Sequence, residues 1–470
     1  MVTSERKHTL CGATCGWVFV TCLSALALWL SCSPSRQAGR PVGTAFQSDV
    51  FTIFFTGSEL GELKPCGCSG GQLGGLDRRG AILDTVGREA RLVVDTGSLV
   101  KGELEQDFVK FRIIVEAFKL LDYDLVNLTE NDLDIAGNLG LLDSLSQAFG
   151  VISARSEKDS DFQGHFTKTI SLVGAAFALT IAAFDPRAGK MESLETLFPS
   201  HRNTRTINIL IVNGDSQAPA SVVAEHASYV DCVICPSDSD EPRVIGDPNK
   251  GPLVFTVGRH GRYVCRLEVG LRLTQSTDTK GSVSCVRNGK YIRFSAVPVT
   301  EDLPQESALV LLYKQYQQLV KESGFLERHL RVPLPDQLAY VGSEACRPCH
   351  EYEYDKWLEQ SHASAYATLE KVGSDFDPEC VVCHVAGLDY EGGFTTPTET
   401  AALKDVGCEN CHGPGSAHVE SLGKVLTSEP KSTCLDCHTP EHSTGYAGNE
   451  QLFMEKIVHW KELKANRSVK

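Results

Sequence analysis

Short apolar runs and helical periodicity alternate along the part of the chain before residue 300. The apolar runs have the length of buried strands and lie at residues 50–55, 91–95, 207–212 and 230–234. Residues 104–121 carry apolar side chains three and four positions apart, which predicts an amphipathic helix. This alternation indicates an α/β domain over residues 48–300, in which a mixed or parallel sheet is covered by helices.

A second amphipathic pattern follows this domain. Residues 306–323 repeat apolar side chains at helical spacing, and Pro333 and Pro335 then interrupt the chain. We therefore expect residues 301–339 to form a helical linker whose helix packs between domains. Residues 340–470 are then a separate module.

Cysteine is the unusual residue of the composition. The 470 residues include 18 cysteines, too many for an ordinary cytosolic enzyme in a chain too long for a small disulfide scaffold. Eight of them fall after residue 340, always as C-x-x-C pairs that are directly followed by histidine. The four motifs are Cys346–Cys349–His350, Cys380–Cys383–His384, Cys408–Cys411–His412 and Cys434–Cys437–His438.

This motif has a specific chemistry. Two thiols three positions apart can each add to a vinyl group of one haem, and the adjacent histidine then supplies an axial nitrogen to the iron. Zinc ligation and disulfides are the alternatives, but zinc pairs do not require a histidine after every second cysteine. We therefore predict four covalently attached c-type haems in residues 340–470, a mostly helical or irregular module whose apolar interior is the porphyrin rings themselves.

The histidine count predicts the second axial ligand. Eight of the 14 histidines lie in the module, and the four that follow the cysteine pairs are proximal ligands. The other four are distal candidates, namely His362, His418, His442 and His459. Met454 is the only methionine there, so mainly bis-histidine ligation is expected. For His442 and His459 the alternative is an ordinary surface histidine.

Several segments of the module resemble the cytochrome c-554 family of multihaem proteins. They are Gly342–Cys346, Val406–His412 and the surroundings of His362 and His418. The resemblance implies that His418 and His362, the latter expected on a helix, ligate iron from the distal side, usually at a haem other than their sequence neighbour. In this family one iron can be left five-coordinate, and an open iron suits redox chemistry on a small molecule.

The N-terminal segment predicts export. Arg6 and Lys7 precede an uncharged apolar run at 16–30, whose length fits a signal peptide and is short for a membrane-spanning helix. Haem attachment requires export as well, because c-type haem is attached outside the cytoplasmic membrane. Residues 1–32 end in Leu-Ser-Cys32, which resembles a bacterial lipoprotein signal; the alternatives to lipidation are simple cleavage and a retained anchor. Residues 33–47 are expected to be a flexible tether.

The α/β domain resembles the metallophosphoesterase domain of 5′-nucleotidase-like proteins. The matching pieces are Gly74–Arg79, Val93–Gly97, Leu121–Asn127 and Val254–Tyr263. The family's metal ligands are replaced in turn by Ser58-Glu59-Leu60, Ser98, Glu130-Asn131-Asp132, Asn213 or Gly214, and Cys235-Pro236-Ser237-Asp238. A two-metal clamp on phosphate oxygens cannot be built in its usual form without those ligands. We therefore expect a degenerate domain that is silent towards phosphate esters.

One loop of this domain offers a different chemistry. Cys66 and Cys68 lie one residue apart beside Lys64, where a ligand would face the strand ends, and they suit a low-pKa redox pair or a soft-metal site. The alternatives are buried free thiols and disulfides, with partners among Cys232, Cys235, Cys265 and Cys285. The Cys232–Cys235 pair lacks a following histidine and is not a haem site.

The acidic excess of the chain indicates which kinds of molecule it binds. Acidic residues exceed basic ones by 60 to 45, and no basic face indicates nucleic acid. Residues 340–470 contain 21 Asp and Glu against 11 Lys and Arg, a balance that steers complementary redox partners. The expected partners are redox proteins or quinol-linked donors.

The predicted function is electron transfer by an exported cytochrome, periplasmic or elsewhere in the cell envelope, and membrane-associated where Cys32 carries lipid. A haem oxidoreductase that acts on a small nitrogen or sulfur species at an open iron is the first alternative. A redox sensor or binding protein that uses the nucleotidase-like domain is the second. An electron carrier is favoured over an enzyme, because histidines suffice to close every iron.

Overall fold

The computed structural model describes residues 49–65, 70–102, 104–154, 162–187, 194–198, 205–214, 228–271, 281–430, 434–439, 442–443 and 445–461. The predicted signal peptide, the tether and the candidate residues Cys32, Cys66 and Cys68 lie outside these ranges. Within them, no helix has both the length and the apolar character that crossing a membrane requires.

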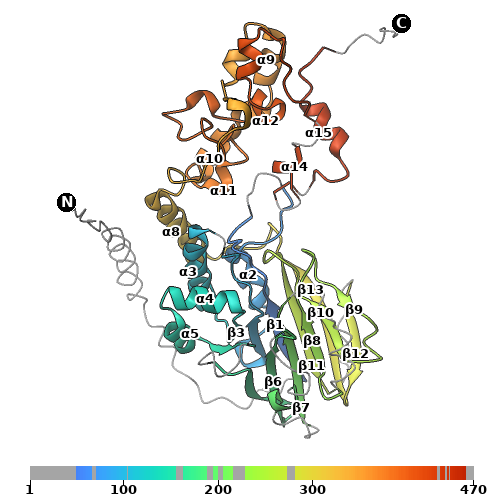
Figure 1. The fold of residues 1–470 in the computed structure, drawn as a ribbon. Helices are drawn as coiled ribbons and strands as arrows, with labels where there is room; N and C mark the ends of the chain where they lie inside the picture. Colours follow the sequence, from blue (N-terminus) through green and yellow to red (C-terminus); the bar gives the residue numbers. More distant parts are fainter. Residues whose placement is uncertain are drawn as a thin grey trace, which may run out of the picture. The chain divides into compact units, whose positions relative to one another are not determined.

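The first sheet of the α/β domain has seven strands in the order β12-β13-β11-β1-β2-β3-β4 (Figure 1). Its strands are β1 (Val50–Thr56), β2 (Arg91–Asp95), β3 (Leu125–Asn127), β4 (Gly150–Ile152), β11 (Tyr263–Gly270), β12 (Val283–Arg287) and β13 (Lys290–Pro298). Strands β1 to β4 are parallel, whereas β11 pairs with β1 in antiparallel register, with Phe55 opposite Cys265. The parallel strands place their carboxyl ends at one edge, where Ser58–Leu60, Ser98 and Glu130–Asp132 follow β1, β2 and β3.

A second sheet of six strands has the order β5-β6-β7-β8-β10-β9. Its strands are β5 (His165–Leu172), β6 (Ala175–Phe184), β7 (Thr206–Val212), β8 (Cys232–Cys235), β9 (Val244–Ile245) and β10 (Leu253–Thr256). The strand expected at 230–234 therefore begins two residues later than predicted. Both sheets are mixed, as the apolar pattern allows.

The two sheets pack face to face, which the sequence analysis missed because it expected a single sheet covered by helices. Alternate residues of β1 point to opposite sides: Phe55 joins the core between the sheets, and Phe54 joins the core under the helices. The Phe55 ring lies edge-on to Phe255 of β10, with centroids 5.9 Å apart. A strand buried on both faces reads as a continuous apolar run, and such a run does not reveal whether a helix or a second sheet covers it.

Helices cover the outer face of the first sheet (Figure 1). They are α2 (Leu76–Leu83), α3 (Glu105–Leu120), α4 (Glu130–Asn138), α5 (Leu142–Ala148) and α8 (Ser307–Ser323), while the short η1 (Arg88–Ala90) precedes β2 and α6 (Leu194–Leu197) packs on the second sheet. The helices predicted at 104–121 and 306–323 are confirmed as α3 and α8. Leu309, Leu312, Tyr316 and Val320 of α8 are buried in the same core as α3.

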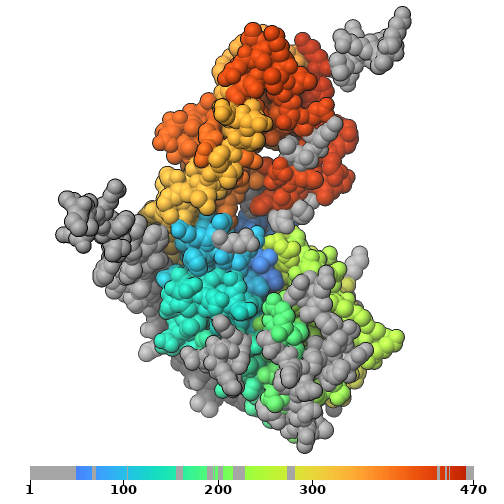
Figure 2. All heavy atoms as spheres, in the orientation of Figure 1, coloured from blue at the N-terminus to red at the C-terminus, as the bar shows by residue number. Residues whose placement is uncertain are grey.

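The C-terminal module consists of short helices and turns, as expected. They are η3 (Pro335–Gln337), η4 (Ser343–Cys346), α9 (Glu351–Leu358), η5 (Ser361–Ser364), α10 (Ala365–Val372), α11 (Pro378–Val381), η6 (Ala401–Leu403), α12 (Cys408–His412), α13 (Ser416–Glu420), α14 (Cys434–Cys437) and α15 (Glu450–Lys456). A small core around Tyr366 and Phe394 holds residues from 326 to 403 together. The orange and red atoms of this module gather in one part of the space-filling view (Figure 2).

Candidate functional site

Three of the four cysteine–histidine motifs lie at one helical turn, whereas in the second motif the His384 N–H donates to the Val381 carbonyl at 2.8 Å. The backbone N–H of His350 donates to the Cys346 carbonyl at 3.0 Å, and that of His438 donates to the Cys434 carbonyl at 2.8 Å. One helical turn places residues i, i+3 and i+4 on the same side. The local backbone therefore directs both thiols and the proximal imidazole of a motif to one face, as attachment of one flat ring requires.

Three proximal histidines face three of the distal candidates. The ring centroids of His350 and His418 are 6.1 Å apart, those of His362 and His438 are 6.3 Å apart, and those of His412 and His459 are 6.3 Å apart. An imidazole nitrogen lies about 2 Å from a bound first-row metal and about 1 Å from its own ring centre, so two imidazoles on opposite sides of one iron have centroids about 6 Å apart. The three pairs leave room for one iron each.

The fourth proximal residue, His384, differs from the others. No other histidine or aromatic ring lies against its ring in the part of the chain that the structure describes. His442, the remaining distal candidate, directs Nδ1 to the Thr439 hydroxyl at 3.0 Å, and its carbonyl accepts a hydrogen bond from Gln72 at 3.2 Å. The geometry thus brings three of the four distal candidates to a proximal histidine and does not bring His442 to His384. His362 lies on the 3₁₀ turn η5 rather than on an α-helix.

Hydrogen bonds at Nδ1 hold the rings in place. His384 donates to the Ala365 carbonyl at 2.7 Å, His418 to the Val425 carbonyl at 2.7 Å and His459 to the Ile457 carbonyl at 2.8 Å. Such bonds fix the tautomer and leave Nε2 for iron. Burial lowers the pKa of His384, of His412 and of His438, which favours the neutral imidazole that a metal binds.

The motifs also approach each other in two couples. The thiol of Cys346 interacts with that of Cys408, and this contact lowers the pKa of Cys408 to about 6. Cys383 interacts in the same way with Cys437. The first motif is therefore a neighbour of the third, and the second is a neighbour of the fourth.

Apolar side chains of the module fit large flat apolar groups. Large apolar residues that are exposed include Leu358, Val372, Val419, Leu422, Val425, Leu426, Leu435, Leu452, Val458 and Trp460. Leu422 is 87% exposed and Leu426 is 83% exposed, whereas leucine side chains are more often buried. Porphyrin faces between the histidine pairs would cover such residues, so the side chains present match the predicted group.

Glu409, inside the third motif, ties the start of the module together. Its side chain is 5% exposed, and it accepts hydrogen bonds from the backbone N–H groups of Val341, Gly342 and Gly415 at 2.7 to 3.1 Å. The carboxylate thus joins the segment before the first motif to the segment that leads to His418. This role holds His350 and His418 at the distance given above.

The strand ends of the α/β domain contain a buried arginine network instead of histidines. The Arg79 guanidinium of α2 makes two contacts of 2.8 Å with the Glu59 carboxylate, and both side chains are fully buried. Arg79 also donates to the Tyr123 hydroxyl at 2.9 Å, and Thr56 links that hydroxyl to Asp95 at 2.8 and 2.7 Å. The positive charge at the strand ends is therefore the Arg79 guanidinium, which is paired with the Glu59 carboxylate.

The residues that replace the family's metal ligands make hydrogen bonds within the protein. Asp132 accepts hydrogen bonds from the N–H groups of Ser98 and Leu99 at 2.8 and 2.9 Å, and Asn127 donates to Asn213 at 2.8 Å. Within the described ranges, no group of three or more His, Cys, Asp or Glu side chains is arranged to hold a metal ion. The side chains that are present therefore connect the loops directly.

The stability of this domain should depend on the charge of Asp95. Burial, together with the Glu59 charge, raises the pKa of Asp95 to about 8. A carboxyl group in an unfolded chain titrates near about 4, so between these values the folded form binds a proton that the unfolded form has lost. Stability therefore decreases as the pH rises from about 4 to 8. Urea denaturation followed by circular dichroism should give a smaller decrease for Asp95→Asn, whereas the exposed control Asp143→Asn should keep the wild-type slope.

The cysteines of this domain are buried thiols. Cys232, Cys235, Cys265 and Cys285 are all buried and free, so none of these four forms the disulfide that was considered for them. Burial raises the pKa of Cys235 to about 11 and raises the pKa of each of the others. Such thiols are poor nucleophiles at neutral pH.

Arg79 and Glu409 are the functional residues that sequence reasoning missed. Arg79 belongs to the Gly74–Arg79 piece that carries the resemblance, yet the sequence does not indicate that its side chain turns to the strand ends. Glu409 lies between two haem-binding cysteines, and an acidic residue there has no characteristic spacing. Their partners are distant along the chain, up to 68 positions for Glu409 and Val341.

Comparison with known proteins relates the C-terminal module to cytochromes. Residues 345–413 match the family model described as cytochrome c554 and c-prime. Cytochrome c-554 of Nitrosomonas europaea is 34% identical over 91 residues, which is 16% of this chain and 39% of that protein. The chain therefore spans about two fifths of the length of this curated relative.

Solved structures similar to the chain include phosphoesterases. The calcineurin-like phosphoesterase YfkN of Bacillus subtilis has a TM-score of 0.42 and 14% identity, covering 57% of this chain and 97% of that one. The 5′-nucleotidase precursor of Thermus thermophilus has a TM-score of 0.43 and 16% identity, covering 69% of this chain and 68% of that one. Through residues 345–413 the C-terminal module is similar to the cytochrome c554 family.

Proposed function

We propose that this chain is an exported multihaem c-type cytochrome that transfers electrons in the cell envelope. Four haems would be attached at the four cysteine pairs, and their irons would cycle between the ferric and ferrous states. The observation that carries the proposal is the approach of three histidine pairs to 6.1–6.3 Å, the separation that one iron between two imidazoles requires. The family relation of residues 345–413 supports the same function.

Six of the histidines would each be an axial ligand of a particular iron. His350 and His418 would hold one iron, His438 and His362 a second, and His412 and His459 a third. Two imidazoles on each iron would limit the rearrangement that accompanies electron transfer. The contacts between Cys346 and Cys408, and between Cys383 and Cys437, favour electron passage within the first–third and second–fourth couples.

A second function is favoured by His384. Since no other ring lies against His384 among the described residues, the iron that it holds would keep one position open. An open iron binds small ligands, so the chain would be an oxidoreductase for a small nitrogen or sulfur species. The buried, neutral His384 suits this role as a proximal ligand anchored by the Ala365 carbonyl.

Haem content and spin state test both proposals. A pyridine haemochrome assay on the purified protein should give four haems c per chain, and far fewer would contradict the electron-transfer proposal. Electron paramagnetic resonance should show three low-spin ferric haems and one high-spin ferric haem. A signal of the high-spin haem that changes with nitric oxide or hydroxylamine would support the oxidoreductase, and a wholly low-spin spectrum would exclude it.

Loss of one distal histidine should change one haem. In His418→Ala the iron held by His350 loses its second imidazole, so one low-spin signal should become high-spin while the haem count stays at four. The matched variant His442→Ala should leave the spectrum unchanged, because the His442 ring bonds to Thr439. An unaltered spectrum in His418→Ala would contradict the assignment of this pair.

Location and partners follow from the sequence. The apolar N-terminal run supports export to the periplasm or envelope, and lipidation at Cys32 would add a membrane anchor. The acidic excess of residues 340–470 supports association with complementary redox proteins or quinol-linked donors, weakened by salt. Cys66 and Cys68 stay a candidate redox pair or metal site.

A further inference from the structure

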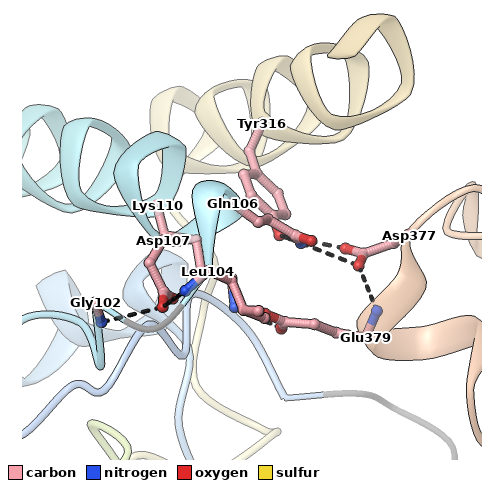
Figure 3. A network of polar contacts seen from close by, with 8 residues as sticks. All are labelled: Gly102, Leu104, Gln106, Asp107, Lys110, Tyr316, Asp377 and Glu379. Carbon is pink, nitrogen blue, oxygen red and sulfur yellow. Dashed lines mark hydrogen bonds and ion pairs between the residues drawn. The ribbon is translucent and has the colours of Figure 1, made fainter. Parts of the chain in front are cut away.

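The α/β domain and the haem module meet at a buried polar contact beside the second motif (Figure 3). Asp377, which caps α11, accepts hydrogen bonds from the Gln106 amide of α3 at 3.0 Å and from the Tyr316 hydroxyl of α8 at 3.2 Å. These three side chains are 7%, 2% and 4% exposed. The first residue of the motif, Cys380, comes three positions after Asp377.

An ion pair lies next to this contact (Figure 3). Lys110 of α3 is 6% exposed, and its ammonium group meets the Glu379 carboxylate at 2.5 Å. The lysine side chain passes close to Gly61, where an added Cβ would come within 3.1 Å of the lysine Cδ. Half-buried Glu62 follows Gly61 in the same loop, and the charges of Lys110 and Glu379 both act on its carboxylate.

The charges at this contact do not balance. Three carboxylates, those of Glu62, Asp377 and Glu379, surround the single buried ammonium of Lys110. Asp377 accepts hydrogen bonds from Gln106, Tyr316 and the Glu379 backbone N–H, which favour its ionised form and oppose the burial that raises its pKa. The Glu379 carboxylate is paired with Lys110. Glu62 is therefore the carboxylate best placed to carry a proton.

The surroundings of Glu62 agree with this assignment. Burial raises the pKa of Glu62 to about 7, with Glu379 of α11 adding to the rise. Lys110 of α3, Arg262 before β11 and Lys101 after β2 oppose it. The group thus titrates near neutral pH, where a small change in local charge alters its protonation.

The same charges act on the haem attachment site. Burial and the fields of Asp377, Glu379 and Glu62 raise the pKa of the Cys380 thiol, while Lys110 opposes them. The second haem would be bonded through the Cys380 sulfur, so the ring edge would lie two bonds from this atom. Charge on that ring and charge on Glu62 would therefore interact across a partly buried contact, where charges are screened less than in bulk water.

We propose that Glu62 is a proton-binding site coupled to the redox state of the haem held by Cys380, Cys383 and His384. When one electron from the donor reduces this iron from ferric to ferrous, the Glu62 carboxylate takes up one proton from water, and it releases the proton on oxidation. The α/β domain thereby makes this electron transfer dependent on pH. The inference rests on the proposed haem attachment and adds a proton to it.

The direction in which the haem potential changes with pH follows from the charges involved. Reduction adds a negative charge near Glu62 and raises its affinity for protons, so the potential falls as the pH rises above about 7. The largest slope is a tenfold change in the one-electron equilibrium per pH unit, about 59 mV. Below about pH 6, where Glu62 is protonated in both states, the potential should be constant.

Redox titration of the full-length holoprotein between pH 5.5 and 9 tests the coupling. The haem held by His384 is followed by its high-spin signal. In the wild type its potential should fall above about pH 7, and in Glu62→Gln this fall should disappear while the other potentials stay the same. Exposed Glu391→Gln serves as the control and should behave as the wild type. An unchanged fall in Glu62→Gln would overturn the proposal and assign the proton to another group.

A second variant keeps the proposal testable if Glu62→Gln fails to fold. Lys110→Gln removes the cation nearest to Glu62 and should move the pH-dependent range upward. An unmoved range would also overturn the proposal. A haem count below four in the wild type would instead refute the proposed attachment. Proton uptake on reduction can also be measured directly with a pH dye in weak buffer. It should drop in Glu62→Gln only.

Discussion

Replacing Glu409 by alanine should lower the free energy of unfolding of the haem module by at least about 3 kcal/mol, because it orphans three backbone donors that cost about 1–3 kcal/mol each when buried. The donors belong to Val341, Gly342 and Gly415, and the carboxylate is 5% exposed. Urea denaturation of the holoprotein, followed by the Soret band, would measure the loss.

Two variants define the cause of this loss. Glu409→Gln keeps one acceptor oxygen and should lose less than Glu409→Ala. Exposed Glu391→Ala should have the stability of the wild type. A haem count of four in each variant would separate loss of the carboxylate from failed haem attachment, and a wild-type midpoint for Glu409→Ala would contradict the prediction.

Replacing Arg79 by methionine should destabilise the α/β domain by about 3–5 kcal/mol, the cost of leaving one member of a buried ion pair alone. Glu59 is fully buried and makes two contacts of 2.8 Å with Arg79. Burial by itself would lower the pKa of the Arg79 guanidinium, but Glu59 and Tyr123 raise it above its ordinary value. The Arg79 guanidinium therefore stays charged across the accessible pH range.

The double variant tests whether the pair acts as a unit. Arg79→Met combined with Glu59→Gln removes both charges, so it should recover much of the stability that Arg79→Met loses. Circular dichroism during urea denaturation measures all three proteins. A double variant less stable than Arg79→Met would show that the two side chains contribute independently.

The apolar pattern predicted the elements of the α/β domain better than their arrangement. The runs at 50–55 and 91–95 become β1 and β2, and the periodic segments become α3 and α8. Pairing across the sheets depends on contacts between distant residues, such as Phe55 with Phe255, and these have no local signal. For this reason the second sheet was not predicted from the sequence.

By itself, the sequence determined the chemistry that depends on residues close together in the chain. A C-x-x-C-H motif places two thiols and an imidazole on one helical turn, so four such sites could be read without coordinates, as could the surplus of histidine over methionine. Only the tertiary structure decided which histidines meet. His350 and His418 lie 68 residues apart, and His384 faces no partner ring among the described residues. The Arg79–Glu59 pair and the contact of Lys110 with Glu379 depend on tertiary structure for the same physical reason: each forms only when separate elements pack together and exclude water.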